Sequence, residues 1–252
     1  MGSCFSRKKK KIPDESYRFW AAVASSLRLG WLGTTNERAE IKACQTALFP
    51  YLLSSSAIEE DFLGFEEHLI EGADISSCDD RRRTALHVAA AQGHIGAVRF
   101  LLQHGANVHA FDCNEETPLF DAIRCRSLEV VKLLLSAGAV LDKSTEELGI
   151  QMCCLAYLGK SEEMEAWKAA GVSFNVADAH GRTPLHVAVC TDQPEMVKFC
   201  IHNGSDPEQR DGFNNRPIDD AERLGLQHMV ELLTYQAHQP TSSGHRWMKS
   251  PE

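Results

Sequence analysis

A 33-residue period runs through most of this chain. Five glycines occur in the stretches EGAD, HGAN, AGAV, AGVS and NGSD, each 33 residues after the one before: Gly72, Gly105, Gly138, Gly171 and Gly204. A second series keeps the same phase, with TALH at 84–87, TPLF at 117–120, TPLH at 183–186 and RPID at 216–219. A fixed period of this length is typical of solenoids, in which each repeat packs against its neighbours.

Each repeat is predicted to hold two short helices. Pro184 follows Thr183 at a helix start, where the missing N–H costs nothing, and Leu185 and Ala188 follow at helical spacing. The stretch EMVKFCIHNG gives the apolar side of a second helix, and Gly204 is expected in the left-handed conformation that ends it.

The period, with T-P-L-H-x-A and a Gly-Ala about 21 residues later, resembles the ankyrin repeat over about residues 46–237. The resemblance implies an all-α fold, an ankyrin-repeat solenoid of helix pairs with short hairpin loops. In such units an aspartate five residues before the threonine helps to order the hairpin, and this role falls to Asp79, Asp112, Asp178 and Asp211. The TPLH histidines, His87 and His186, are then expected to form structural hydrogen bonds and not to act as catalysts.

Some units depart from the pattern. Residues 146–158, EELGIQMCCLAYL, lack TPLH and are predicted to be a degenerate helical pair. Residues 47–74 predict an incomplete first pair. The last unit is expected to turn a polar outer face to solvent, as a terminal cap requires, with these residues: Asp219, Asp220, Glu222 and Arg223. About five to six units are thus expected within residues 46–238.

Residues 43–205 also resemble the C-terminal ankyrin portion of animal cytosolic asparaginases, also described as lysophospholipases, and the degenerate unit carries much of this resemblance. In that family the catalytic threonines and lysine belong to an N-terminal domain, which residues 1–45 are too few to form. The stretch LGTTNE at 32–37 is interpreted as a loop that leads to a helix capped by Asn36. We therefore expect no enzymatic activity, although a non-catalytic companion of such enzymes is an alternative.

The charge of the chain is divided unevenly. The net charge is −9, yet five consecutive residues are basic: Arg7, Lys8, Lys9, Lys10 and Lys11. The remaining residues are strongly acidic and would be repelled by nucleic acid and by anionic lipid headgroups. Only residues 1–13, the basic head, suit a negatively charged surface.

The first residues, MGSCFS, fit the pattern for N-myristoylation of Gly2 after removal of Met1. One myristoyl chain binds membranes only marginally, with a constant of about 10⁴ M⁻¹, so a second signal is needed. Cys4 offers a palmitoylation site, and the basic run offers attraction to anionic lipid. We expect a lipid-anchored protein at the cytoplasmic face of a membrane, with the plasma membrane as first choice. An ordinary tail with a free thiol, or a nuclear localisation signal, are the alternatives.

Residues 14–45 are predicted to be a helical arm. In DESYRFWAAVASSLRL, residues 14–29, the apolar residues Phe19, Trp20, Val23 and Leu27 lie roughly on one helical face. This face would rest on the membrane, bind a partner, or fold back over the first repeat. Residues 239–252 are expected to be a disordered tail.

The nine cysteines show no C-x-x-C spacing and no secretory signal precedes them, so reduced thiols are expected. Cys153 and Cys154, with the remote His180 and His186, lack zinc-ligand spacing, and no metal, cofactor or small-molecule substrate is expected. The stretch at 19–33 is too short and too polar to cross a bilayer.

Ankyrin stacks bind proteins through hairpin tips and inner helices. The first tip carries Arg81 and Arg82, with Arg83 adjacent, and is suited to an acidic partner unless Asp79 and Asp80 neutralise it locally. His180 and Phe213 are the binding candidates at later tips. The leading hypothesis is a lipid-anchored ankyrin adaptor for an unidentified cytosolic protein, and a nuclear ankyrin protein directed by its basic head is the remaining alternative.

Overall fold

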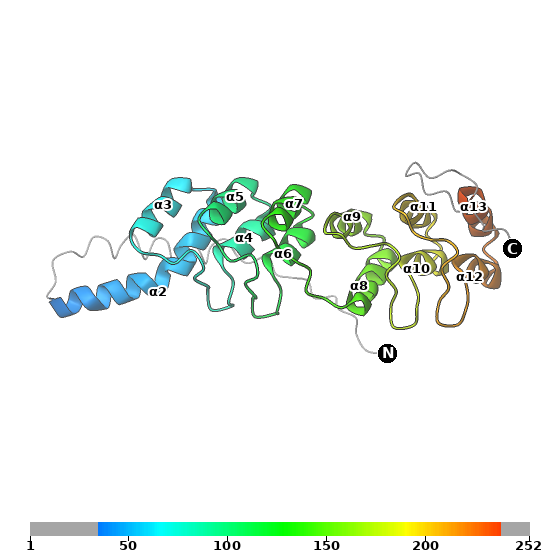
Figure 1. Cartoon of the computed structure of the whole chain (residues 1–252), viewed down its shortest axis with the longest axis horizontal. Coiled ribbons are helices and arrows are strands. Elements are labelled where there is room, and N and C mark those ends of the chain that lie inside the picture. The colour runs from blue at the N-terminus through cyan, green and yellow to red at the C-terminus, as the bar shows by residue number, and fades with distance from the viewer. Residues whose placement is uncertain (1–34, 238–252) are drawn as a thin grey trace. The chain divides into compact units, whose positions relative to one another are not determined.

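A computed structural model describes residues 35–237, which fall into two compact units, 35–140 and 141–237 (Figure 1). Each unit is described by itself. The described residues of both units are helical and contain one isolated β-bridge, between Cys78 and Thr84. The fold is therefore all-α, as the repeat pattern predicted. The motifs predicted in residues 1–34 and 238–252, including the basic head and the tail, lie outside the described residues.

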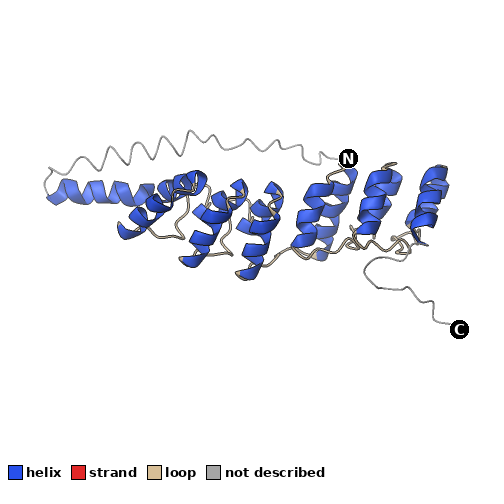
Figure 2. Ribbon diagram, turned by 90° about the horizontal axis from the view of Figure 1, so that it is seen from above, coloured by secondary structure: helices blue, strands red, loops and turns tan. Residues whose placement is uncertain are grey.

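Unit 1 consists of three antiparallel helix pairs, seen side by side in Figure 2. Its helices are α2 (Thr35–Glu59), α3 (Phe62–Ile70), α4 (Ala85–Gln92), α5 (Ile95–Gln103), α6 (Pro118–Cys125) and α7 (Leu128–Ser136). The inner helices α2, α4 and α6 pack on one another, and α5 packs on α7 outside them. Ala89, Ala90 and Ala122 are completely buried, because small side chains let the inner helices approach closely.

Unit 2 repeats this arrangement. Its helices are α8 (Thr145–Tyr157), α9 (Ser161–Ala169), α10 (Pro184–Cys190), α11 (Pro194–His202), α12 (Pro217–Leu224) and α13 (Gln227–Ala237). The inner helix α10 lies between α8 and α12 and packs on both. Met152, Met164, Leu185 and Met229 are fully buried and form the centre of its core.

The two sequence series mark helix boundaries. Thr84, Thr117 and Thr183 are N-caps, and proline occupies the first turn of α6, α10 and α12, where its lack of an N–H is tolerated. The five glycines of the 33-residue series all have positive φ, between 82° and 96°. They follow the outer helices and provide the left-handed residue that turns the chain towards the next repeat.

The degenerate unit is a helical pair, α8 and α9, and it differs from the other units in one respect. α8 begins at Thr145, behind a capping box of Ser144 and Glu147, so an extra helical turn occupies the place of the aspartate and its hairpin. Gly149 in this turn approaches the next segment closely. A Cβ there would lie 1.9 Å from the carbonyl oxygen of Ala177, which only glycine avoids.

Two sequence expectations were wrong in detail. Asp220 is only 2% exposed and does not belong to a polar outer face, because it pairs with Arg223 and accepts the thiol of Cys190 at 3.5 Å. Glu222 and Arg223 are exposed as expected, and Asp219 is half-buried against Arg216. Asn36 lies inside α2 and not at its N-cap.

The predicted first pair consists of α2 and α3. α2 has 25 residues and contains Pro50 in its interior.

Candidate protein-binding surface

Four hairpin turns, which we call fingers, project from the helix pairs beside the inner helices (Figure 1). Fingers 1 and 2 (residues 78–84 and 111–117) belong to unit 1, and fingers 3 and 4 (residues 177–183 and 210–216) to unit 2. Each finger contains one aspartate of the predicted series: Asp79, Asp112, Asp178 and Asp211. The aspartates build the fingers in the same way.

In each finger one carboxylate oxygen accepts two backbone hydrogen bonds. In finger 1, Oδ1 of Asp79 accepts the N–H groups of Arg81 at 2.9 Å and Arg83 at 2.8 Å. The same two bonds, to the residues two and four positions on, recur in the other fingers at 2.7–2.9 Å. The role that the ankyrin resemblance implied for these aspartates is confirmed.

The bonds hold the third residue after each aspartate at positive φ, in the left-handed region: Arg82, Glu115, Gly181 and Asn214. Three of these are not glycine, so the closed turn offsets the strain of this conformation.

Neighbouring fingers in each unit are tied together. The N–H of Cys113 donates to the carbonyl of Arg81 at 2.9 Å, and the N–H of Gly212 donates to the carbonyl of His180 at 2.7 Å. A Cβ on Gly212 would lie 2.7 Å from that carbonyl oxygen, so glycine permits the approach. The tips thus form a connected backbone edge in each unit.

The TPLH histidines fix the base of each finger. Nδ1 of His87 accepts the N–H of Thr84 at 3.1 Å, so its proton is on Nε2, which donates to the carbonyl of Glu116 at 3.2 Å. Burial lowers the pKa of His87, which keeps the ring neutral. His186 bonds in the same way with Thr183 and with the carbonyl of Asn215 at 3.1 Å. The prediction that these histidines are structural is confirmed.

Cys153 takes the histidine position of the degenerate unit. Its thiol donates to the carbonyl of Arg182 at 3.2 Å. This acceptor lies 29 residues further along the chain, which is also the spacing between His87 and its acceptor Glu116. Burial raises the pKa of this thiol to about 12, so it remains protonated and inert at neutral pH. The adjacent Cys154 is half-buried, as expected for side chains that diverge on a helix.

The three arginines of finger 1 have different environments. Nη2 of Arg83 pairs with Oδ2 of Asp79 at 2.8 Å, and both side chains are nearly buried. Arg81 and Arg82 are exposed, and no acidic group of residues 46–235 forms an ion pair with either of them. Local neutralisation therefore applies to Arg83, and two positive charges stand at the tip of an otherwise acidic molecule.

The tips of unit 2 are less charged and more aromatic. His180 is exposed, and Phe213 on the neighbouring tip is 72% exposed. Because the backbone bond from Gly212 to His180 joins these tips, the two rings stand on adjacent fingers. Exposed aromatic side chains on an ordered backbone are typical anchors at protein interfaces.

An acidic cluster lies at the base of finger 2. Arg124 bridges Glu116 at 2.6 Å and Asp121 at 3.4 Å, where Asp121 belongs to the inner helix α6. Burial raises the pKa of Asp121 to about 7, and the charges of Glu116 and Asp112 act in the same direction.

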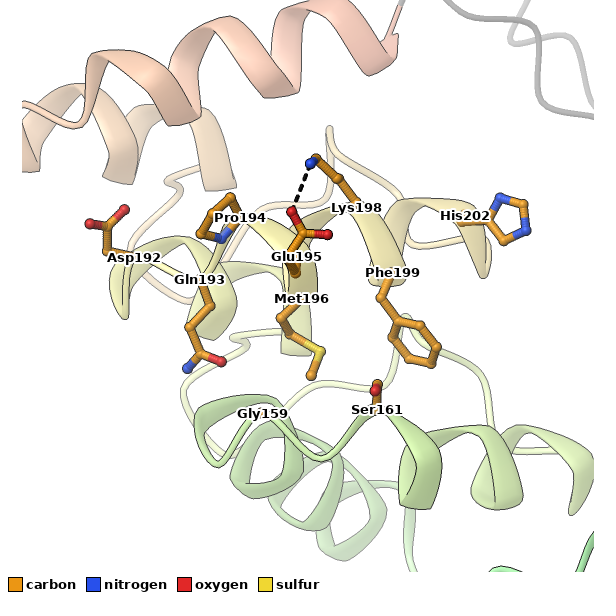
Figure 3. A pocket seen from close by; sticks show the side chains of 10 residues that line it. All are labelled: Gly159, Ser161, Asp192, Gln193, Pro194, Glu195, Met196, Lys198, Phe199 and His202. Carbon is orange, nitrogen blue, oxygen red and sulfur yellow. Dashed lines mark hydrogen bonds and ion pairs between the residues drawn. The ribbon is translucent and has the colours of Figure 1, made fainter.

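Unit 2 also has an open groove of about 810 Å³, away from the fingers (Figure 3). Met196 and Phe199 of α11 provide its apolar lining, and Gly159 and Ser161 lie on the opposite side. Glu195 and Lys198 at its rim pair at 2.8 Å.

Several of the predicted sites lie in parts of the chain that the structure does not describe. Gly2, Cys4 and the basic run at 7–11 lie outside the described residues, as does the predicted helix at 14–29. Within residues 46–235, no three His, Cys, Asp or Glu side chains are grouped to hold a metal ion. None of the described helices has the length and apolarity to cross a bilayer.

Asp121 gives a pH dependence that can be tested. Because its pKa is higher in the folded chain than the usual 3.8, the folded state holds more protons between about pH 4 and pH 7, and stability falls as pH rises through this range. Asp121→Asn removes this loss. We expect the variant to gain on the order of 2 kcal/mol over wild type between pH 4.5 and pH 8 in urea denaturation. Glu115→Gln, at an exposed position of the same finger, is the control, and an equal gain there would contradict the assignment.

Comparison with known proteins agrees with this geometry. Residues 55–145 match the family described as Ankyrin repeats (3 copies), and residues 180–212 match the family described as Ankyrin repeat. The residues between these matches include the degenerate pair α8 and α9.

Similar proteins share the repeats within different contexts. An L-asparaginase of Dirofilaria immitis is 36% identical over 191 residues, which are 76% of this chain and 32% of that protein. The potassium channel AKT2/3 of Arabidopsis thaliana is 35% identical over 51% of this chain and 16% of the channel, and human inversin is 31% identical over 65% and 16%. The chain thus spans a third or less of each of these relatives.

A solved structure supports the fold alone. A chain from the complex of a predatory endopeptidase of Bdellovibrio bacteriovorus with its immunity protein superimposes with a TM-score of 0.52 at 22% identity, over 73% of this chain and 97% of that chain. Together with the fingers, the glycine turns and the bonded histidines, the matches show that this chain belongs to the ankyrin-repeat family.

Proposed function

We propose that this chain is a lipid-anchored ankyrin adaptor, which holds a protein partner at the cytoplasmic face of a membrane, the plasma membrane in the first instance. Ankyrin repeats are protein-interaction modules, and this part of the proposal follows from the family. The observation that carries the adaptor role is the connected edge of finger tips, which is held by backbone bonds and exposes side chains that the fold does not use.

The chemistry of the tips indicates the kind of contact. Arg81 and Arg82 are directed to solvent on finger 1, so we assign them to an acidic stretch of the partner. Phe213 and His180 would add aromatic contacts from unit 2. Since the carboxylates fix the finger backbones, little ordering entropy would be lost on binding.

Arg82→Glu tests the role of finger 1. The equivalent residue of finger 2, Glu115, adopts the same φ of 58°, so glutamate is compatible with the turn. Once a partner has been identified by cross-linking and mass spectrometry, we expect the variant to weaken its binding about fivefold or more in calorimetry. Arg99→Glu changes the same charge on the outer helix α5 and should bind as wild type does. Equal affinities of both variants and wild type would show that finger 1 is not the contact.

The anchor is the second part of the proposal. It is supported by the sequence of residues 1–11, where a myristoylation pattern at Gly2, a thiol at Cys4 and five basic residues follow one another. Two acyl chains, or one with a basic patch, provide the stable attachment that a single myristoyl chain lacks.

Labelling of cells with an alkynyl myristate analogue tests the anchor. We expect label on wild type and none on Gly2→Ala, and we expect only wild type in the membrane fraction. Cys4→Ser should keep the label and lose part of the membrane association, because one acyl chain and the basic run remain. Membrane-bound Gly2→Ala would contradict the lipid mechanism, and nuclear accumulation of an unlabelled wild type would favour the nuclear alternative.

The similarity to an asparaginase raises a second candidate function, hydrolysis or assistance of a hydrolase. We propose that the chain itself is not an enzyme, because the shared part is a third of that protein and the TPLH histidines and Cys153 are engaged in structural bonds. The purified chain should release no ammonia from asparagine and no fatty acid from lysophospholipid. Turnover above that of a heat-denatured sample would refute this part of the proposal.

A further inference from the structure

The outer helix α3 exposes two large aliphatic side chains. Leu63 is 74% and Ile70 is 85% exposed. They are seven residues apart, two helical turns, and therefore lie on one stripe of the helix. Glu66 and Glu67 stand between them and are also exposed, and we call these four residues the α3 outer face.

Among the outer helices of the described residues, α3 alone has aliphatic side chains at both of these positions. α5, α7, α9 and α11 start 33, 66, 99 and 132 residues after α3 and have the same length, so their positions correspond one to one. The equivalents of Leu63 are Gly96, Glu129, Glu162 and Glu195, and the equivalents of Ile70 are Gln103, Ser136, Ala169 and His202. All of these are small or polar. In the longer helix α13, which starts 165 residues after α3, the equivalents are His228 and the exposed Tyr235. The aliphatic residues of α3 are the exception.

The corresponding positions in other helices show where this face points. A Cβ on Gly96 of α5 would meet the ring of Phe62 in α3 at 3.0 Å, so the position of Leu63 is directed at the preceding outer helix. In α11, Glu195 and His202 line the groove opposite Ser161 of α9 (Figure 3). Leu63 and Ile70 are therefore directed to the side on which a preceding outer helix would stand, and residues 35–61 contain only the inner helix α2 before α3.

The surroundings of the face are acidic. Residues 46–80 contain nine aspartates and glutamates and no lysine or arginine. Two aliphatic anchors within an acidic surface fit an amphipathic helix that carries positive charges at the edges of its apolar side.

We propose that residues 14–29 of this chain pack on the α3 outer face as a helix and supply the outer helix that α3 lacks. The segment has an apolar side of Phe19, Trp20, Val23 and Leu27. Its basic residues are Arg18 and Arg28, and its acidic residues, Asp14 and Glu15, stand at its start. It also has the reach. A 16-residue helix spans about 24 Å and the five residues up to Thr35 about 17 Å more, enough to return along the whole of α2, about 37 Å long.

Hydrogen exchange of the complete chain tests the contact, with protein that carries no acyl group and in the absence of membranes. We expect the amides of residues 14–29 to exchange about tenfold or more slowly in wild type than in the double variant Leu63→Glu/Ile70→Glu. Both positions are exposed, so the repeats themselves should stay folded, and the amides of the inner helices α4 and α6 should keep their wild-type protection. Leu224→Glu replaces an exposed leucine of α12 and is the control, with wild-type protection expected.

A photo-cross-link identifies the occupant. With Leu63→p-benzoylphenylalanine, we expect an intramolecular product that mass spectrometry maps to residues 14–29, and none of it from the same substitution at Leu224. A cross-linked dimer would assign the face to a second copy and overturn the proposal, as would equal exchange in wild type and double variant. Because the sample used in these experiments carries no acyl group, either negative result would leave the lipid-anchor proposal unaffected.

Discussion

Each finger depends on one carboxylate oxygen that accepts two backbone N–H groups, at distances of 2.7–2.9 Å in all four cases. Such charge-assisted bonds satisfy donors that no helix or sheet would satisfy in a short turn. They also hold a left-handed residue at the tip, even where it is arginine, glutamate or asparagine. The turn therefore does not depend on the side chains at the tip, so fingers with the same backbone conformation can have tips of different charge.

A second position in the repeat determines how a finger is attached. Histidine stands there in α4 and α10, and its Nε2–H reaches the carbonyl of the next finger. The thiol of Cys153 in α8 makes the same connection. In α6 this position is held by Phe120, which has no polar hydrogen to donate. In the next repeat the helical turn at Gly149 stands where a finger would otherwise be. The residue type at this position thus agrees with whether a finger follows.

The sequence predicted the features that repeat and missed those that depend on a single contact. The glycine phase, the threonine caps, the turn aspartates and the bonded histidines follow from chain geometry that each unit shares. The burial of Asp220 could not be predicted, because a charged residue in a terminal helix is expected to face solvent unless a partner such as Arg223 is known. The helical turn that replaces a finger before Gly149 was missed for the same reason, since it rests on the approach of Ala177.

The finger arginines and α3 show that the position of a residue within the repeat carries information that composition alone does not. RRR at 81–83 reads as one basic patch, yet the ion pair of Arg83 with Asp79 leaves only two of its charges at the tip. Leu63 and Ile70 look like ordinary apolar residues of an amphipathic helix until α3 is aligned with α5, α7, α9 and α11. An end of a repeat stack must be polar or covered. The last inner helix of unit 2, α12, exposes the charged Glu222 and Arg223 beside Leu224. By contrast, α3 carries two aliphatic residues where α5, α7, α9 and α11 carry small or polar ones, which is the composition expected of a surface that is covered.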